Sequence, residues 1–128
     1  GATPLHIATQ KGHDDMAKLL LAHGATVDAA MNDGCTPLRV AAEAGHDDMA
    51  KFLLAHGATV DAATSNGPSP LHFAVWNGHD DMAKLLLAHG ATVDAAMNNG
   101  ATPLHIATQK GHDDMAKLLL AHGATVDA

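Results

Sequence analysis

Apolar residues follow the chain in two short helical patterns, and both patterns return every 33 residues. The first predicts a helix from about Pro4 to Lys11 with three apolar contacts: Leu5, Ile7 and Ala8. The second predicts a helix that ends at about His23, with apolar residues at three- and four-residue spacing: Met16, Leu19 and Leu20. Because one helix pair cannot bury both apolar faces alone, the pairs are expected to stack on their neighbours.

Local signals mark the ends of both helices. Thr3 precedes a proline, so its hydroxyl can cap free backbone amides while the proline loses no hydrogen bond. Gly12 and Gly24 suit the left-handed conformation that ends a helix. Residues 26–34 finish in Asn-Asp-Gly, which predicts an extended turn leading to the next helix pair.

Two sequence strings recur in phase with the apolar pattern. Thr-Pro-Leu-His at residues 3–6 returns as Thr-Pro-Leu-Arg at 36–39, as Ser-Pro-Leu-His at 69–72 and as Thr-Pro-Leu-His at 102–105. The string Gly-His-Asp-Asp-Met-Ala-Lys follows each copy, first at residues 12–18. Four such copies in phase resemble the ankyrin repeat, and the resemblance covers the whole chain.

The resemblance implies an all-α fold, an ankyrin-repeat solenoid of stacked helix-turn-helix units joined by projecting β-hairpin-like turns. Residues 1–128 would form a single ankyrin-repeat domain with four repeats: 1–33, 34–66, 67–99 and 100–128. In the family, hairpin tips and first helices line a concave groove that binds a protein partner. The resemblance therefore implies a non-enzymatic protein–protein interaction module.

The family resemblance also assigns a structural role to most histidines. It implies that seven of them hydrogen-bond to backbone within and between repeats: His6, His72, His105, His13, His46, His79 and His112. Arg39 stands at the position of His6, His72 and His105 in the other three repeats. Whether repeat two makes the corresponding hydrogen bond is therefore left open.

Composition and charge narrow the range of partners. Fourteen acidic residues against seven basic ones give a formal charge of −7, which opposes the phosphate neutralisation that nucleic-acid binding needs. Nucleic acid is therefore not expected as a partner, and basic proteins are mildly favoured. No apolar stretch approaches the roughly 18 residues of a membrane span, and no signal peptide is seen, so a cytoplasmic or otherwise intracellular location is expected.

Differences between repeats gather at the connections and on the first helices, whereas the second helix hardly varies. Because residues needed for stacking must recur, the varied positions are candidates for contact with a protein partner. We expect the partner-binding residues to be Trp76, Asn77, Arg39, Glu43, Asn32, Asp33, Cys35, Ser65, Asn66, Pro68, Asn98 and Asn99.

Trp76 is the strongest of these candidates. It is the only tryptophan, and the equivalent residues of the other repeats are polar: Gln10, Glu43 and Gln109. An exposed aromatic side chain among polar ones resembles a binding hot spot. The alternative is that Trp76 packs against a neighbouring helix as satellite core, where Phe73 is expected.

Two further candidates are open to more than one interpretation. Arg39 either contacts the partner or pairs with Glu43, which lies one helical turn further on. Cys35 is the only cysteine and is expected to be an exposed or partly exposed contact residue rather than a nucleophile.

The eleven histidines suggest metal or acid–base chemistry, but they form three ladders that follow from the repetition. Equivalent side chains of stacked helices lie about 8–10 Å apart, whereas a metal needs each ligand nitrogen within about 2.1 Å. No metal site is therefore expected. With no nucleophile–base pair and no phosphate-cradling glycine loop, neither catalytic residues nor a cofactor are expected.

The two ends suggest an alternative function. Residues 1–29 are identical to residues 100–128, and neither terminal repeat carries the polar substitutions of a capping repeat. Two complementary faces predict head-to-tail self-association, so the chain could be a structural self-associating array. A fragment of a natural ankyrin-repeat adaptor, or part of a longer capped protein, is a further alternative.

The near-identical framework bears on the origin of the chain. Variation confined to one face favours an engineered or consensus-derived sequence, although a recently duplicated natural array would show similar identity.

Overall fold

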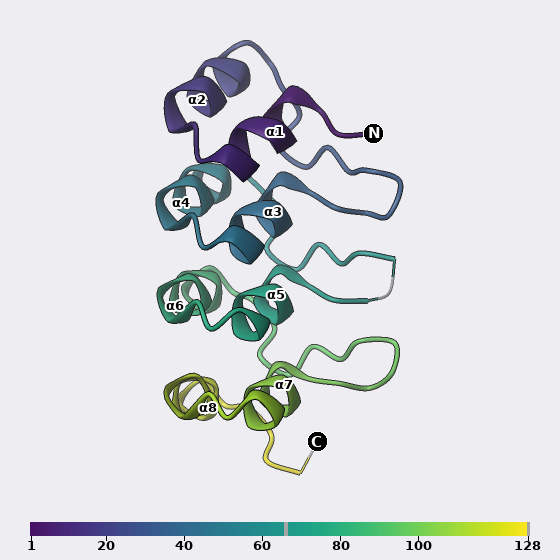
Figure 1. Cartoon of the computed structure of the whole chain (residues 1–128), viewed down its shortest axis with the longest axis vertical. Coiled ribbons are helices and arrows are strands. Elements are labelled where there is room, and N and C mark those ends of the chain that lie inside the picture. Colours follow the sequence, from purple (N-terminus) through teal and green to yellow (C-terminus); the bar gives the residue numbers. More distant parts are fainter. Residues whose placement is uncertain (66, 128) are drawn as a thin grey trace.

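The computed structural model describes residues 1–65 and 67–127, so the candidate residue Asn66 lies outside the described residues. Within that part of the chain, helices form four pairs and no strand is present. The helices are α1 (Pro4–Lys11), α2 (Asp14–Ala22), α3 (Pro37–Ala44), α4 (Asp47–Ala55), α5 (Pro70–Trp76), α6 (Asp80–Ala88), α7 (Pro103–Lys110) and α8 (Asp113–Ala121). Figure 1 shows the pairs stacked along the long axis, with hairpin loops projecting beside the odd-numbered helices.

The local signals in the sequence set the helix ends. The backbone N–H of His6 donates to the Thr3 hydroxyl at 3.3 Å, and Gly12 ends α1 in the left-handed region with φ 69°. The predicted bounds of the first helix are confirmed. The second helix ends at Ala22, so His23 becomes its C-terminal cap.

Each described hairpin is closed by its own backbone. The N–H of Met31 donates to the carbonyl of Cys35 at 2.9 Å, and the N–H of Gly34 donates to the carbonyl of Met31 at 2.8 Å. Gly34 has φ 85°, a left-handed conformation that favours glycine at this turn. The projecting hairpin-like turns implied by the family resemblance are thus present.

Histidine rings join neighbouring repeats in two ladders. The N–H of Ser69 donates to His72 Nδ1 at 3.0 Å, so the other ring nitrogen, Nε2, carries the proton and donates to the Ala101 carbonyl at 3.3 Å. His6 makes the same pair of bonds between repeats one and two. In the second ladder, His79 reaches back to the carbonyl of Glu43 at 3.1 Å. The backbone hydrogen bonds that the family resemblance assigns to these histidines are present for five of the seven: His6, His72, His105, His46 and His79. In the part of the chain that the structure describes, the rings of His13 and His112 make no such bond.

A third ladder joins the segments that follow the second helices. The Asp28 carboxylate accepts hydrogen bonds from the Thr59 N–H and hydroxyl at 2.9 and 2.7 Å. The pairs Asp61–Thr92 and Asp94–Thr125 repeat this arrangement. Sequence analysis did not predict this contact, although threonine and aspartate recur at these positions in all four repeats.

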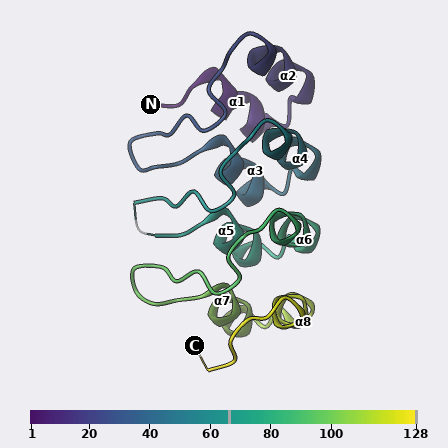
Figure 2. The ribbon, with the colours of Figure 1, turned by 180° about the vertical axis from the view of Figure 1, so that it is seen from behind.

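The core runs as a continuous line through the stack. Its members recur at the same positions of successive repeats and are fully buried in the middle of the chain: Leu38, Met49, Leu53, Leu71, Met82 and Leu86. From behind, the even-numbered helices form a column of their own (Figure 2). Among the described residues, no helix is long and apolar enough to cross a membrane.

Candidate partner-binding surface

Several varied residues meet in a hollow between repeats two and three, on the side of the hairpins and first helices. We call it the central hollow; it has a volume of about 260 Å³ and is lined by Asp33, Arg39, Thr64, Ser65, Pro68, Phe73 and Trp76. Residues from two hairpins and two first helices therefore contribute to one surface feature. The sequence predicted this surface by position, but it did not predict which residues would meet.

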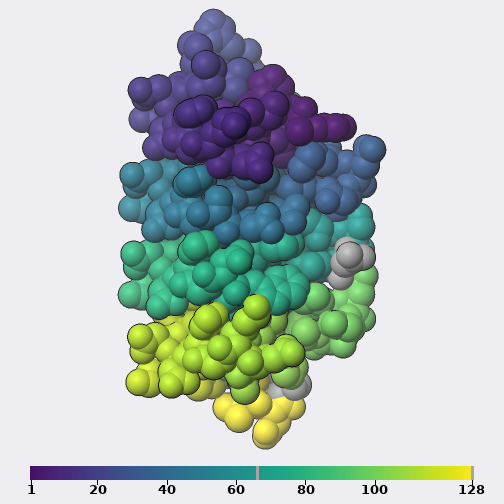
Figure 3. Space-filling view, in the orientation of Figure 1, coloured from purple at the N-terminus to yellow at the C-terminus, as the bar shows by residue number. Residues whose placement is uncertain are grey.

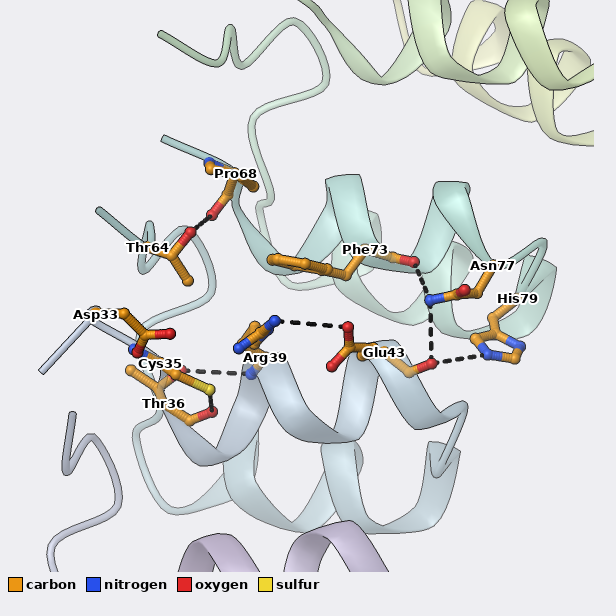
Figure 4. A network of polar contacts seen from close by, with 10 residues as sticks. All are labelled: Asp33, Cys35, Thr36, Arg39, Glu43, Thr64, Pro68, Phe73, Asn77 and His79. Atoms are coloured by element: carbon orange, nitrogen blue, oxygen red, sulfur yellow. Dashed lines mark hydrogen bonds and ion pairs between the residues drawn. The ribbon is translucent and has the colours of Figure 1, made fainter. Parts of the chain in front are cut away.

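Arg39 lies at the centre of this surface. Its guanidinium carbon lies 4.3 Å from the centroid of the Phe73 ring, within the range of a cation–π interaction. Its Nη2 donates to Glu43 Oε2 at 3.5 Å (Figure 4). The interpretation that Arg39 pairs with Glu43 is confirmed. Because the pair is partly exposed, it contributes less than about 1 kcal/mol, and the contact with the Phe73 ring is of similar size.

Arg39 also keeps an unused donor. Its Nε is buried and has no hydrogen-bond partner among the residues that the structure describes. A buried donor without an acceptor is costly. The central hollow therefore has an aromatic wall and a cationic group that is not fully satisfied.

Trp76 combines both interpretations of its role. It is half-buried and packs against the hydrophobic core, as the core alternative expected. It also lines the central hollow, with its ring centroid 5.7 Å from that of Phe73. One part of the indole is therefore fixed by packing while another faces the hollow, which is the arrangement of a rigid aromatic anchor.

Phe73 lines the central hollow, although sequence analysis expected it only in the core. It is 9% exposed and so belongs to the core, as expected, but its ring also forms the wall on which Arg39 stacks. The sequence contained a sign of this role, because residues 73 and 76 are three residues apart and therefore share one face of α5. No other repeat has an aromatic residue at both positions.

Cys35 and Pro68 differ from expectation. Cys35 is 0% exposed, so the prediction of an exposed or partly exposed contact residue is wrong. Repeat one covers this turn, because the His6 ring lies against it and donates to the Cys35 carbonyl at 2.8 Å. Burial raises the pKa of the Cys35 thiol, and the nearby Arg39 offsets this only in part. Pro68 occupies the equivalent position of repeat three and is buried as well.

The candidate residues at the hairpin tips are exposed: Asn32, Asp33, Ser65, Asn98 and Asn99. Several of them also bind one another. The N–H and hydroxyl of Ser65 donate to the Asp33 carbonyl at 2.7 and 2.9 Å, and Asn98 Nδ2 donates to the Ser65 carbonyl at 3.4 Å. Part of the variation at the tips therefore serves contacts between hairpins.

Asn77 likewise has a structural contact. Its side-chain amide donates to the carbonyls of Glu43 and Phe73 at 3.2 and 3.1 Å (Figure 4), while the residue remains exposed. It connects the ends of α3 and α5 at the edge of the surface. The carboxylate of Glu43 is exposed and pairs with Arg39.

A second hollow adjoins the first along the stack. It has a volume of about 340 Å³, and its lining includes Ile7, Gln10, Met31, Arg39 and Glu43. Arg39 lines both hollows, so the surface continues across repeats one to three. Within residues 1–65 and 67–127, no cluster of three or more histidine, cysteine, aspartate or glutamate side chains is placed to hold a metal ion.

Comparison with known proteins adds one positive result. A family model described as "Ankyrin repeats (3 copies)" matches residues 1–64 and again residues 59–128. The two matches together span the whole chain. No curated protein matches the sequence.

Proposed function

The chain belongs to the ankyrin-repeat family, and we propose that it is a non-enzymatic binding module that holds a protein partner across its hairpins and first helices. Ankyrin repeats are generally protein–protein interaction modules. The binding surface would be the concave side around the central hollow. The exposed tip residues would form its rim.

The observation that carries this proposal is the grouping of Arg39, Phe73 and Trp76 around one hollow. All three are departures from the repeated framework, and they come from adjacent repeats. Hot spots of interfaces are rich in tryptophan and arginine and lie in pockets that exclude water. The hollow would accept one apolar side chain of the partner, with a backbone carbonyl or carboxylate placed against the guanidinium.

Substitution at Trp76 tests this proposal once a binder has been selected from a displayed protein library. Trp76→Gln introduces the residue that repeats one and four carry at this position, so the helix should still form. Affinity should fall by more than about 1 kcal/mol, roughly fivefold, in isothermal titration calorimetry. Trp76→Ala should do the same.

The matched control is Gln109→Ala, at the equivalent position of repeat four, which should leave affinity unchanged. Circular dichroism would show that each variant keeps its helices. Partners that bind equally well to the wild type and to Trp76→Gln would place the binding surface elsewhere.

A structural self-associating array is the second candidate function. It is favoured by the identity of residues 1–29 and 100–128, because a contact that joins two repeats within the chain would also fit between two copies of it. We also propose an engineered or consensus-derived origin. The near-identity of the second helices in all four repeats supports that origin.

A further inference from the structure

Asparagine is followed directly by glycine at three places in the chain: Asn66–Gly67, Asn77–Gly78 and Asn99–Gly100. Asparagine is chemically labile, and in such a pair the backbone nitrogen of the glycine can attack the side-chain amide carbon of the asparagine. Glycine has no Cβ that obstructs this approach. Because Asn66 lies outside the described residues, the structure compares the other two pairs.

Asn77 is held firmly at the end of α5. Its side-chain nitrogen, Nδ2, donates to the carbonyls of Glu43 and Phe73 at 3.2 and 3.1 Å. Its backbone caps the helix with φ −95° and ψ 3°, and the N–H of Gly78 donates to the Val75 carbonyl at 3.1 Å. An attack by the Gly78 nitrogen on the Asn77 side chain therefore requires both side-chain bonds to break and the end of α5 to open.

Asn99 is held by fewer contacts. It is exposed at the tip of the hairpin between α6 and α7, and this hairpin, drawn in green, lies at the right-hand edge of the molecule (Figure 3). Its Oδ1 accepts a hydrogen bond from the Ala101 N–H at 3.0 Å, and among the described residues its side chain makes no other. Nδ2, the nitrogen that would leave, is therefore not held.

The glycine that follows Asn99 also has room to move. The N–H of Gly100 donates to the Met97 carbonyl at 2.8 Å, so this pair, like Asn77–Gly78, has one backbone bond to open. No atom lies within 4 Å of the Cβ position of Gly100. The tip can therefore change conformation without displacing a neighbouring element, whereas at Asn77 the neighbouring helix is attached.

The turn at Asn99 can also accommodate aspartate. The hairpin between α2 and α3 has Asp33 at the equivalent position. Asp33 Oδ1 accepts a hydrogen bond from the Cys35 N–H at 2.9 Å, which is the same contact that Asn99 makes with Ala101. Aspartate at residue 99 would therefore keep the turn, and it would add one negative charge to the formal charge of −7.

From these contacts we infer that Asn99 is a site of spontaneous deamidation in the folded protein and that Asn77 is protected from it. The Gly100 nitrogen gives up its proton and bonds to Cγ of Asn99, while the bond from Cγ to Nδ2 breaks and the nitrogen leaves as ammonia with that proton. Water then opens the five-membered imide at either carbonyl, which gives aspartate or isoaspartate. Water is the only other reactant. The inference goes beyond the proposed function and holds whether or not the hairpins bind a partner.

Peptide mapping tests the inference on the whole chain, incubated at mildly alkaline pH both folded and unfolded in urea. Trypsin cuts after Lys84 and Lys110, so Asn77 and Asn99 fall in different peptides, and fragment ions separate Asn99 from Asn98. In the folded chain Asn99 should deamidate at least about tenfold faster than Asn77, because two further hydrogen bonds must open at Asn77. In urea the two should react at similar rates, since glycine follows both.

The variant Asn99→Asp represents the aspartate product. It should keep the circular dichroism spectrum and the urea midpoint of the wild type, and it should elute from an anion exchanger with the acidic species that the ageing wild type forms. An Asn99 that stays intact in the folded chain while it reacts in urea would overturn the inference. So would an Asn77 that reacts as fast as Asn99 in the folded chain. Unfolding of Asn99→Asp would show that the turn does not accept the product.

Discussion

Position 39 shows how a single residue is accommodated in a strict repeat. In repeats one and three the imidazole at this position donates to the carbonyl of the next hairpin. Arg39, in repeat two, stacks on Phe73 instead, and the corresponding carbonyl of the next hairpin belongs to Pro68. There the hydroxyl of Thr64, which stands where the other hairpins have methionine, approaches the Pro68 carbonyl at 3.5 Å. The backbone N–H of Thr64 also donates to this carbonyl, at 3.0 Å, and both Arg39 and Thr64 line the central hollow.

His72 makes folding stability depend on pH. Burial lowers the pKa of its imidazole, while hydrogen bonds to backbone carbonyls oppose the shift. The unfolded chain then binds more protons than the folded one below about pH 6.5, so the free energy of unfolding falls as the pH drops through that value towards the folded pKa. Above it the full contribution is present.

Urea unfolding at about pH 7.5 and about pH 5.5 would measure this loss. His72→Gln removes the titrating group and leaves the rest of the sequence unchanged. The wild type should therefore lose more stability on acidification than the variant. Equal losses would show that His72 is not the group responsible.

Among the elements, the helix ends were predictable and the exposure of the turns was not. Pro4, Gly12 and Gly24 act through their own backbone conformations, so a single repeat contains the information that sets the helix ends. The exposure of Cys35 depends on the His6 ring, 29 residues earlier in the chain. A local pattern does not reveal such a cover, so variation at a position did not by itself indicate exposure.

The glycine that ends each first helix offers a matched pair of substitutions. Gly45 and Gly111 have left-handed φ values of 76° and 69°, so alanine strains the backbone at both, by about 1 kcal/mol. At Gly45 the new Cβ would also lie 2.8 Å from the His79 ring, which is held by its bond to Glu43, whereas at Gly111 no atom lies within 4 Å.

Gly45→Ala should therefore cost about 1 kcal/mol more in free energy of unfolding than Gly111→Ala. Urea titrations followed by circular dichroism would give both values. Similar costs for the two variants would mean that the His79 ring moves aside freely and that its bond to the Glu43 carbonyl adds little to the junction.

At the scale of the whole molecule, stability is distributed over junctions between neighbours. The period of 33 residues was enough to predict the stack, because only neighbouring repeats can cover each apolar face. It did not predict that the tryptophan at position 76 would be half-buried, since the repeats offer no aromatic equivalent for comparison. Repetition thus made the framework predictable, while the unique residues of the central hollow required the structure.

Two identical methionines measure how much one junction contributes. Met82 is 0% exposed between repeats two and three, and its equivalent Met16 is 50% exposed in repeat one. Met82→Ala should lower the free energy of unfolding by about 2–5 kcal/mol, because it leaves a cavity in the stack. Met16→Ala should change it by no more than about 0.5 kcal/mol. Urea unfolding followed by circular dichroism would measure both. A similar loss at the two positions would mean that folding is not a sum of neighbour contacts, and that the first repeat is as tightly held as the middle of the stack.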